Sequence, residues 1–148
     1  MIKKLNQQAL NRLLRGSHGT VWLNGKEMIT TQKIELKMAG DFETVQVCGD
    51  NTDYSLYNGW NGSGTLEYLK YDSEVSKLIV EAFVSGVMPE IEMICLLENP
   101  ATGKRERCRV SDITFTEATV LAFEKKAFIN DSVPFNFSSF EYLENIEY

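Results

Sequence analysis

The spacing of hydrophobic and polar side chains along the chain predicts a protein built mainly from β-strands. From residue 20 the sequence reads TVWL, then Asn24-Gly25, then KEMIT. An Asn-Gly step between two extended runs is a strong hairpin signal, because a type I′ turn needs positive φ at both central positions. The outgoing run is predicted to continue as one long strand, since Ile34, Leu36 and Met38 alternate with charged residues.

The middle of the chain is rich in residues that favour turns. Residues 42–49 (FETVQVCG) continue the alternation, and residues 49–63, rich in Gly, Asn, Asp and Ser, are predicted to form a loop or an exposed hairpin tip. Within YNGWNGSGTLEYLKY (57–71), two Asn-Gly steps flank Trp60. We interpret this stretch as a return turn that leads into a strand over 64–71. Trp60 either packs inside its own subunit or contacts another molecule, and both interpretations stay open.

One segment changes its period from two to 3.6 residues. The apolar positions of DSEVSKLIVEAFVSG recur at helical spacing, which predicts an amphipathic helix over about residues 73–85. Asp72 or Ser73 is suited to cap its start, and Gly86 lies just beyond its end. The apolar stripe of this helix should lie against a sheet. Its members are Val75, Leu78, Ile79, Ala82 and Phe83.

After the helix the pattern returns to strands. Residues 91–97 and 105–110 read as a hairpin around a turn at 99–104, a further strand is predicted over 111–123, and another over 133–143. The sum is seven to nine strands with one flanking helix. We therefore predict a mainly β fold, an antiparallel two-sheet β-sandwich or barrel, formed by residues 1–148 as a single domain.

The N-terminal residues 1–15 are predicted to be either a short helix or an arm that becomes ordered against a partner. This segment has neither the unbroken apolar core nor the cleavage site of a signal peptide, and the longest apolar runs are too short for a membrane span. These features favour a protein made and kept in a cytoplasm.

Charge is divided unevenly along the chain. Residues 1–38 hold seven Lys/Arg and two Asp/Glu, a net charge of +5. The other 110 residues hold eight Lys/Arg and nineteen Asp/Glu, a net charge of −11. The acidic part argues against specific nucleic acid binding, because it repels phosphates. The division suits head-to-tail association of copies, although a mixed surface without meaning is an equal alternative.

Catalytic, metal and cofactor chemistry find little support in the sequence. His18 is the only histidine, so a histidine-based triad or a Cys/His zinc site would depend on it. Cys48, Cys95 and Cys108 have no metal-type spacing and are interpreted as small buried residues in a reducing compartment. No residue is assigned a catalytic, metal-binding or cofactor-binding role, and we predict that the protein is not an enzyme.

The number of aromatic residues expected on the surface is the feature of the sequence that most requires a functional explanation. Tyrosines and a tryptophan of this number anchor protein interfaces and also line sugar sites. Long strands with unpaired edges favour edge-to-edge oligomers. Self-assembly and carbohydrate binding by a β-sandwich are therefore rival hypotheses. The aromatic residues concerned are Tyr54, Tyr57, Trp60, Tyr68, Tyr71, Tyr142 and Tyr148.

Four stretches in order carry a family resemblance: GSHGTVWLNGKEM (16–28), NGSGTLEY (61–68), RVSDITF (109–115) and VPFNFSSFE (133–141). Together they resemble the tail tube proteins of contractile phage tails, specifically the PBSX-prophage type. The resemblance spans nearly the whole chain, with gaps mainly over 40–58. The same family supplies the tubes of phage-tail-like bacteriocins, and the secreted tube of type VI systems is a related alternative.

The resemblance implies a self-assembling structural protein without cofactors. Such subunits form six-membered rings, whose inner sheets join into one barrel, and the rings stack inside a contractile sheath. The implied partners are further copies, the tail sheath protein, and baseplate and tail terminator proteins. The resemblance also allows DNA to pass through the lumen without specific binding, and it implies no membrane partner.

The resemblance also implies a location and a set of contacts. Assembly would take place in the bacterial cytoplasm, and the product would be a virion tail or tail-like particle. The hairpin from about Thr30 to Tyr57 and the N-terminal arm are the expected contacts between rings. Phe42, Tyr57 and Trp60 are the residues expected to anchor the subunit interface.

Overall fold

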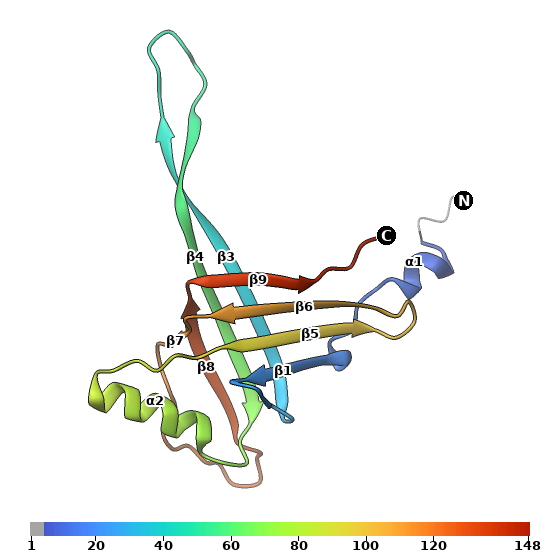
Figure 1. The fold of residues 1–148 in the computed structure, drawn as a ribbon, viewed down its shortest axis with the longest axis vertical. Coiled ribbons are helices and arrows are strands. Elements are labelled where there is room, and N and C mark those ends of the chain that lie inside the picture. The colour runs from blue at the N-terminus through green and yellow to red at the C-terminus, as the bar shows by residue number, and fades with distance from the viewer. Residues whose placement is uncertain (1–4) are drawn as a thin grey trace.

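The computed structural model describes residues 5–148 as two antiparallel β-sheets with a helix at one side (Figure 1). Strands form 48% of the structure and helices 14%, so the predicted mainly β, two-sheet fold is confirmed. The first sheet has the order β2-β1-β5-β6-β9 and the second β3-β4-β8-β7. The strands of the first sheet are β1 (Gly19–Leu23), β2 (Lys26–Glu27), β5 (Met93–Asn99), β6 (Lys104–Ser111) and β9 (Ser139–Glu144). Those of the second are β3 (Thr31–Val45), β4 (Tyr54–Leu69), β7 (Thr114–Phe115) and β8 (Asn130–Phe137).

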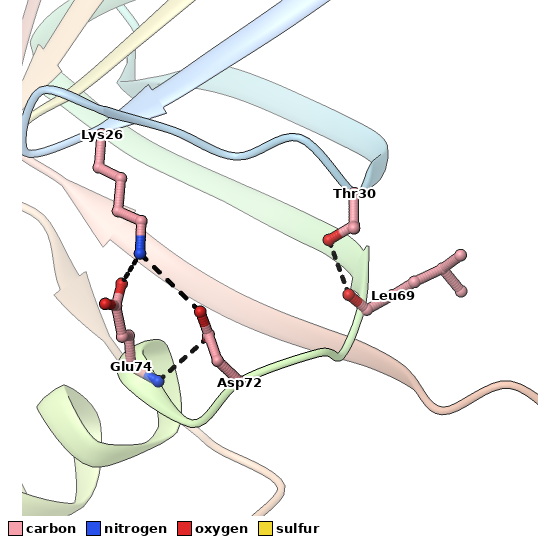
Figure 2. Close-up of polar contacts among 5 residues, drawn as sticks. All are labelled: Lys26, Thr30, Leu69, Asp72 and Glu74. Atoms are coloured by element: carbon pink, nitrogen blue, oxygen red, sulfur yellow. Dashed lines mark hydrogen bonds and ion pairs between the residues drawn. The ribbon is translucent and has the colours of Figure 1, made fainter.

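The first predicted hairpin is confirmed, but the long outgoing strand is not continuous. Asn24 and Gly25 have φ values of 51° and 82°, as a type I′ turn requires. The strand then breaks at residues 28–30, where the Thr31 hydroxyl donates to the Met28 carbonyl at 2.7 Å. Thr30 donates to the carbonyl of Leu69 at 2.7 Å (Figure 2). This break carries the chain from the first sheet to the second.

The predicted helix is confirmed as α2 (Glu74–Ser85), and it ends at Gly86, which has a φ of 75°. At its start, Asp72 accepts a hydrogen bond from the Glu74 backbone N–H at 3.3 Å. Lys26 pairs with both Glu74 and Asp72, which joins the β1–β2 turn to the helix (Figure 2). The buried side of α2 packs on the core through Val75 and Ile79.

The core lies between the sheets and extends along a chain of aromatic rings. Phe115, Phe135, Phe137 and Phe140 contact one another in sequence, with ring centroids 5.8, 6.4 and 6.3 Å apart. Phe135 and Phe137 belong to β8, and Phe140 belongs to β9 in the other sheet. The rings therefore connect the two sheets.

The predicted return turn at residues 57–64 is wrong, because this stretch lies inside β4. The glycines serve close packing instead. A Cβ on Gly62 would lie 2.5 Å from the Phe137 ring, and one on Gly64 would lie 2.6 Å from the Phe135 ring. Glycine leaves the space that these β8 rings fill. The true connection to β3 is residues 46–53, the tip of the hairpin.

The C-terminal half confirms one hairpin and corrects two strands. β5 and β6 pair around residues 100–103, with Gly103 at a φ of 70°. Only β7 forms within the predicted strand 111–123, and residues 116–129 are irregular, with Leu121 and Phe123 exposed. The predicted strand over 133–143 is divided at Ser138 into β8 and β9, which belong to different sheets.

The N-terminal segment lies beside the C-terminus (Figure 1). Its helix α1 spans only Gln7–Asn11. Buried Asn99 donates to the Asn11 carbonyl at 2.8 Å, and Arg12 lies over the ring of Tyr148 at 4.2 Å. Residues 1–4 of the predicted arm lie outside the described residues. No helix within residues 5–148 is long and apolar enough to cross a membrane.

Candidate assembly interface

The β3–β4 hairpin projects far beyond the rest of the molecule (Figure 1). β8 pairs with β4 only over residues 62–69, so β3 and β4 continue as a two-stranded ribbon through residues 39–61. We call residues 38–61 the arm. A two-stranded ribbon is marginal alone in water, so the arm needs a further surface against which to pack.

One face of the arm continues the core face of the second sheet. Ile34 and Leu36 pack against the core, and alternation along β3 places Met38 and Phe42 on the same side. Beyond the first sheet these side chains lose their cover: Met38 is 50% exposed and Phe42 is 60% exposed. The hydrophobic face therefore extends past the core of its own subunit.

The three residues expected to anchor the interface lie on this face. Tyr57 pairs with Phe42, with ring centroids 5.7 Å apart, and is 56% exposed. Trp60 pairs with Gly40, and a Cβ on Gly40 would lie 2.5 Å from the Phe42 ring. The structure thus gathers all three residues along one stretch of the arm. We call Phe42, Tyr57 and Trp60 the aromatic strip.

A β-bulge puts Tyr57 on that face. The pairing passes from Asp41↔Gly59 to Phe42↔Tyr57, which leaves Asn58 as the extra residue, and Gly59 has a φ of 135°. Without the extra residue, Asn58 would occupy the position of Tyr57, because side chains alternate along a strand. The Asn58-Gly59 step is the sequence signal for this bulge, although sequence reasoning took it for a turn.

Trp60 differs from the other two because it reaches the core. It is half-buried, and its ring centroid lies 6.1 Å from that of Phe137. It therefore packs within its own subunit and does not stand free as the sugar platform considered from the sequence. The exposed part of its ring lies on the same face of the arm as Phe42 and Tyr57.

The other face of the distal arm also carries apolar side chains, which sequence reasoning did not bring together on one face. Val45 pairs with Tyr54, Leu56 pairs with Glu43, and all three apolar side chains are exposed. Their alternation was hidden because residues 54–56 were assigned to a loop. A ribbon with apolar side chains on both faces suits insertion between surfaces.

Local hydrogen bonds hold the tip in shape. Asp50 accepts from the Thr52 backbone N–H at 2.9 Å and from the Tyr54 hydroxyl. These hydrogen bonds, that from Tyr54 first, lower the pKa of the Asp50 carboxyl below its ordinary value. Gln46 donates to Asp53 at 2.9 Å across the same turn. The tip is therefore a defined structure that can be presented to a partner.

The outward face of the second sheet is polar. Glu35 lies between Lys33 and Lys37, with N–O distances of 3.6 and 2.8 Å. The hydrogen bond from Lys37 lowers the pKa of Glu35. Neutral side chains continue this face on β4 and β8, including Ser63, Thr65 and Asn136. The face combines paired charges with hydroxyl and amide groups.

Both edges of the second sheet are open within residues 5–148. β3 pairs only with β4, and β7 with the following Thr116 covers only residues 134–136 of β8. Edges of this length attract another strand unless they are covered. The sheet can therefore be extended from both sides by copies of itself.

The residues considered for chemistry lie apart from one another. His18 is exposed in a short 3₁₀ helix, and Cys48 is exposed on the arm tip, which contradicts its interpretation as a buried residue. Cys95 and Cys108 are half-buried. Among residues 5–148, no three His, Cys, Asp or Glu side chains gather where they could hold a metal ion.

The chain belongs to the phage tail tube protein family, whose model matches residues 6–144. Two similar proteins of Bacillus subtilis (strain 168) are the phage-like element PBSX protein XkdM and the uncharacterized protein YqbM. The first is 24% identical over 135 residues, which cover 90% of this chain and 92% of the relative. The second is 23% identical over 136 residues, with the same coverage. The resemblance to the PBSX-prophage type is confirmed.

Solved structures share the fold. The sheath–tube complex of the extracellular contractile injection system PVC contains a chain with a TM-score of 0.74 and 10% identity, covering 96% of this chain and 100% of that one. The SPP1 tail tube gives a TM-score of 0.63 and 11% identity, covering 91% and 81%. Both comparisons show that chains of these assemblies share the two-sheet architecture.

Proposed function

We propose that this phage tail tube protein is the subunit of the inner tube of a contractile phage tail or phage-tail-like bacteriocin. The observation that carries the proposal is the arm, which exposes the aromatic strip on one face and Val45, Tyr54 and Leu56 on the other. Copies of the same chain would cover these surfaces. The role is structural, and we assign no catalytic residue.

In the proposed assembly, six copies form a ring by joining their second sheets edge to edge. The open edge of β3 and the nearly uncovered side of β8 support this arrangement, because each subunit then offers one edge to each neighbour. The arm would reach the adjacent ring. Phe42 and Tyr57 would supply most of its contact area, with Trp60 at its base.

The polar face of the second sheet would line the lumen. Its lysines are balanced by Glu35 and by Glu67, which lies opposite Lys33 in the register, and its members on β8 are neutral, so it offers DNA no basic track to bind. The closed barrel would keep the apolar face toward the first sheet. DNA could then pass without specific contacts in a tail that carries it.

The proposed partners are the tail sheath, baseplate and terminator proteins. Support comes from the neighbouring structures, which include a sheath–tube complex, a tube-terminating cap and a six-fold symmetrised baseplate. The contractile type is proposed from the match to the sheath–tube complex of a contractile injection system. Assembly would occur in the bacterial cytoplasm before the tail or particle is complete.

Electron microscopy of the purified protein at high concentration tests the proposal. We expect rings or tubes, and we expect Phe42→Ala and Tyr57→Ala each to reduce their number while circular dichroism stays unchanged. Trp60→Ala should also weaken assembly, with a modest loss of stability because its ring contacts Phe137.

Tyr71→Ala is the matched control, since Tyr71 is 56% exposed, as Tyr57 is, but precedes α2 on the body of the molecule. It should assemble like the wild type. A strictly monomeric protein at all concentrations would contradict the proposed function. Unchanged tubes from all three arm variants would remove the aromatic strip from the interface.

A further inference from the structure

Cys95 and Cys108 face each other across the β5–β6 hairpin. They are direct partners in the antiparallel register, between the pairs Leu96↔Arg107 and Ile94↔Arg109. Directly opposed Cα atoms in antiparallel strands lie about 4.5–5.5 Å apart. Disulfides span Cα separations of about 4.4–6.8 Å. The backbone can therefore accept a bond between these two sulfurs without moving to another register.

Both thiols line one cavity. Its volume is about 550 Å³, and it lies between the first sheet and β3, with Val21, Ile34 and Leu36 among its walls. Cys95 and Cys108 are each half-buried, so the pair is partly shielded but still reachable. The cavity is large enough for the reactive end of a small thiol reagent to approach both sulfurs.

The contact between the thiols makes them unequal. The hydrogen bond to Cys108, and then burial, raise the pKa of the Cys95 thiol. The same hydrogen bond lowers the pKa of Cys108, because it stabilises the Cys108 thiolate. A thiolate is the nucleophile in disulfide exchange, so Cys108 is suited to attack first and Cys95 to resolve.

We propose that Cys95 and Cys108 form a redox site, which a small-molecule disulfide of the glutathione type oxidises to an intrasubunit disulfide. The Cys108 thiolate attacks one sulfur of the reagent, forming a mixed disulfide and releasing one thiolate. Cys95 then loses its proton to solvent and attacks the Cys108 sulfur, releasing the second thiolate. Two protein thiols and one small disulfide thus give one protein disulfide and two small thiols.

The consequence would be a covalent link within the first sheet. In a reducing cell the pair stays as thiols, and a disulfide becomes favourable once the protein enters an oxidising medium. The bond would constrain the β5–β6 hairpin, which anchors the N-terminal segment through Asn99. This site is independent of the proposed tube function, since it needs no second copy.

The test uses the full chain with Cys48→Ser, which removes the exposed thiol of the arm tip. The reduced protein is incubated with oxidised glutathione, and remaining thiols are alkylated and located by mass spectrometry of nonreduced peptides. We expect a peptide pair joined through Cys95 and Cys108, no retained glutathione, and a higher thermal midpoint that dithiothreitol reverses.

Two further variants isolate the steps. Adding Cys95→Ser should trap glutathione on Cys108, whereas adding Cys108→Ser should leave Cys95 reacting more slowly. Persistent glutathione on Cys108 while Cys95 is present would overturn the proposal, as would full alkylation of both thiols after oxidation. Joined peptides that form equally fast in denaturant would also overturn it, because the folded register would then have no role.

Discussion

Gly64 shows at the residue scale how tightly the second sheet meets the core. A Cβ at this position would lie 2.5 Å from the Glu35 carbonyl oxygen and 2.6 Å from the Phe135 ring. Neither group can withdraw easily, since one is strand backbone and the other fills the centre of the core. We expect Gly64→Ala to lower the free energy of unfolding by about 1–3 kcal/mol, measured by urea unfolding.

Gly16→Ala is the control for that substitution. No atom lies within 4 Å of a Cβ built on Gly16, so its effect should stay within about 0.5 kcal/mol. Equal stability of the two variants would show that β4 and the Phe135 ring move apart more easily than their packing indicates.

The buried hydroxyl of Tyr68 should make the stability of the protein depend on pH in the alkaline range. Its hydroxyl donates to buried Asp131 at 3.2 Å. Burial first, and the Asp131 charge second, raise its pKa above the ordinary value of 10.0. Because the unfolded chain loses this proton first, the stabilisation is complete below about pH 10 and is lost as pH rises toward the folded-state pKa. Tyr68→Phe should weaken this alkaline loss, at a cost near neutral pH of about 1 kcal/mol.

Unfolding of both proteins at a series of pH values from neutral to alkaline measures the effect. Exposed Tyr71 provides the matched variant, and Tyr71→Phe should follow the wild-type curve. Parallel curves for wild type and Tyr68→Phe would show that Tyr68 titrates alike in the folded and unfolded chain.

At the scale of elements, the sequence predicted correctly those elements that are determined by residues close together in the chain. The Asn24-Gly25 hairpin and α2 followed from turn residues and a 3.6-residue period, and both are confirmed. The stretch around Trp60 was mistaken for a turn, because Gly62 and Gly64 are explained by the β8 rings that pack over them. Those rings lie more than 70 residues away in the sequence, where no local pattern could show them.

The candidate interface was predictable in part for the same reason. Phe42, Tyr57 and Trp60 were named through the family resemblance, and the structure brings them together on one face. Tyr54 and Leu56 lie within the hairpin expected to contact the next ring, but they were not named as anchors, because residues 49–63 were read as a loop or hairpin tip. The pairing of β3 with β4 shows which residues of β4 alternate between the two faces, and this alternation is hard to see in a segment so rich in glycine.

Removal of the arm tests whether this element serves assembly and not folding. Replacing residues 41–59 with Asn-Gly joins the opposed residues Gly40 and Trp60 by a tight turn. We expect a folded subunit, because the core residues lie outside the deleted segment. Tubes should be absent by electron microscopy at concentrations where the full chain assembles.

A substitution at the tip serves as the control for this deletion. Cys48→Ser keeps the arm at full length and should assemble normally. An armless variant that still forms stacked tubes would place the contacts between rings elsewhere, while one that fails to fold would show that the arm supports the body.

At the scale of the whole molecule, the uneven division of charge along the sequence is partly neutralised by ion pairs in the folded structure. The first 38 residues carry a net of +5 and the remainder −11, yet some of these charges are paired locally, as Lys26 is with Glu74. The unpaired remainder can act over the distance between two copies. In a head-to-tail stack, unpaired charges of opposite sign on two copies would attract each other before the apolar arm makes contact.

This attraction predicts that salt slows tube growth. The Debye length falls from about 10 Å at 0.1 M salt to about 3 Å at 1 M, so charges on approaching copies cease to steer them. We expect the initial rate, followed by light scattering, to fall as sodium chloride rises over this range, with folded monomer unchanged by circular dichroism. Sucrose at matched osmolality should not slow growth, because it leaves charges unscreened. Growth that is equal or faster at high salt would mean that the apolar arm, and not the charge division, governs how copies meet.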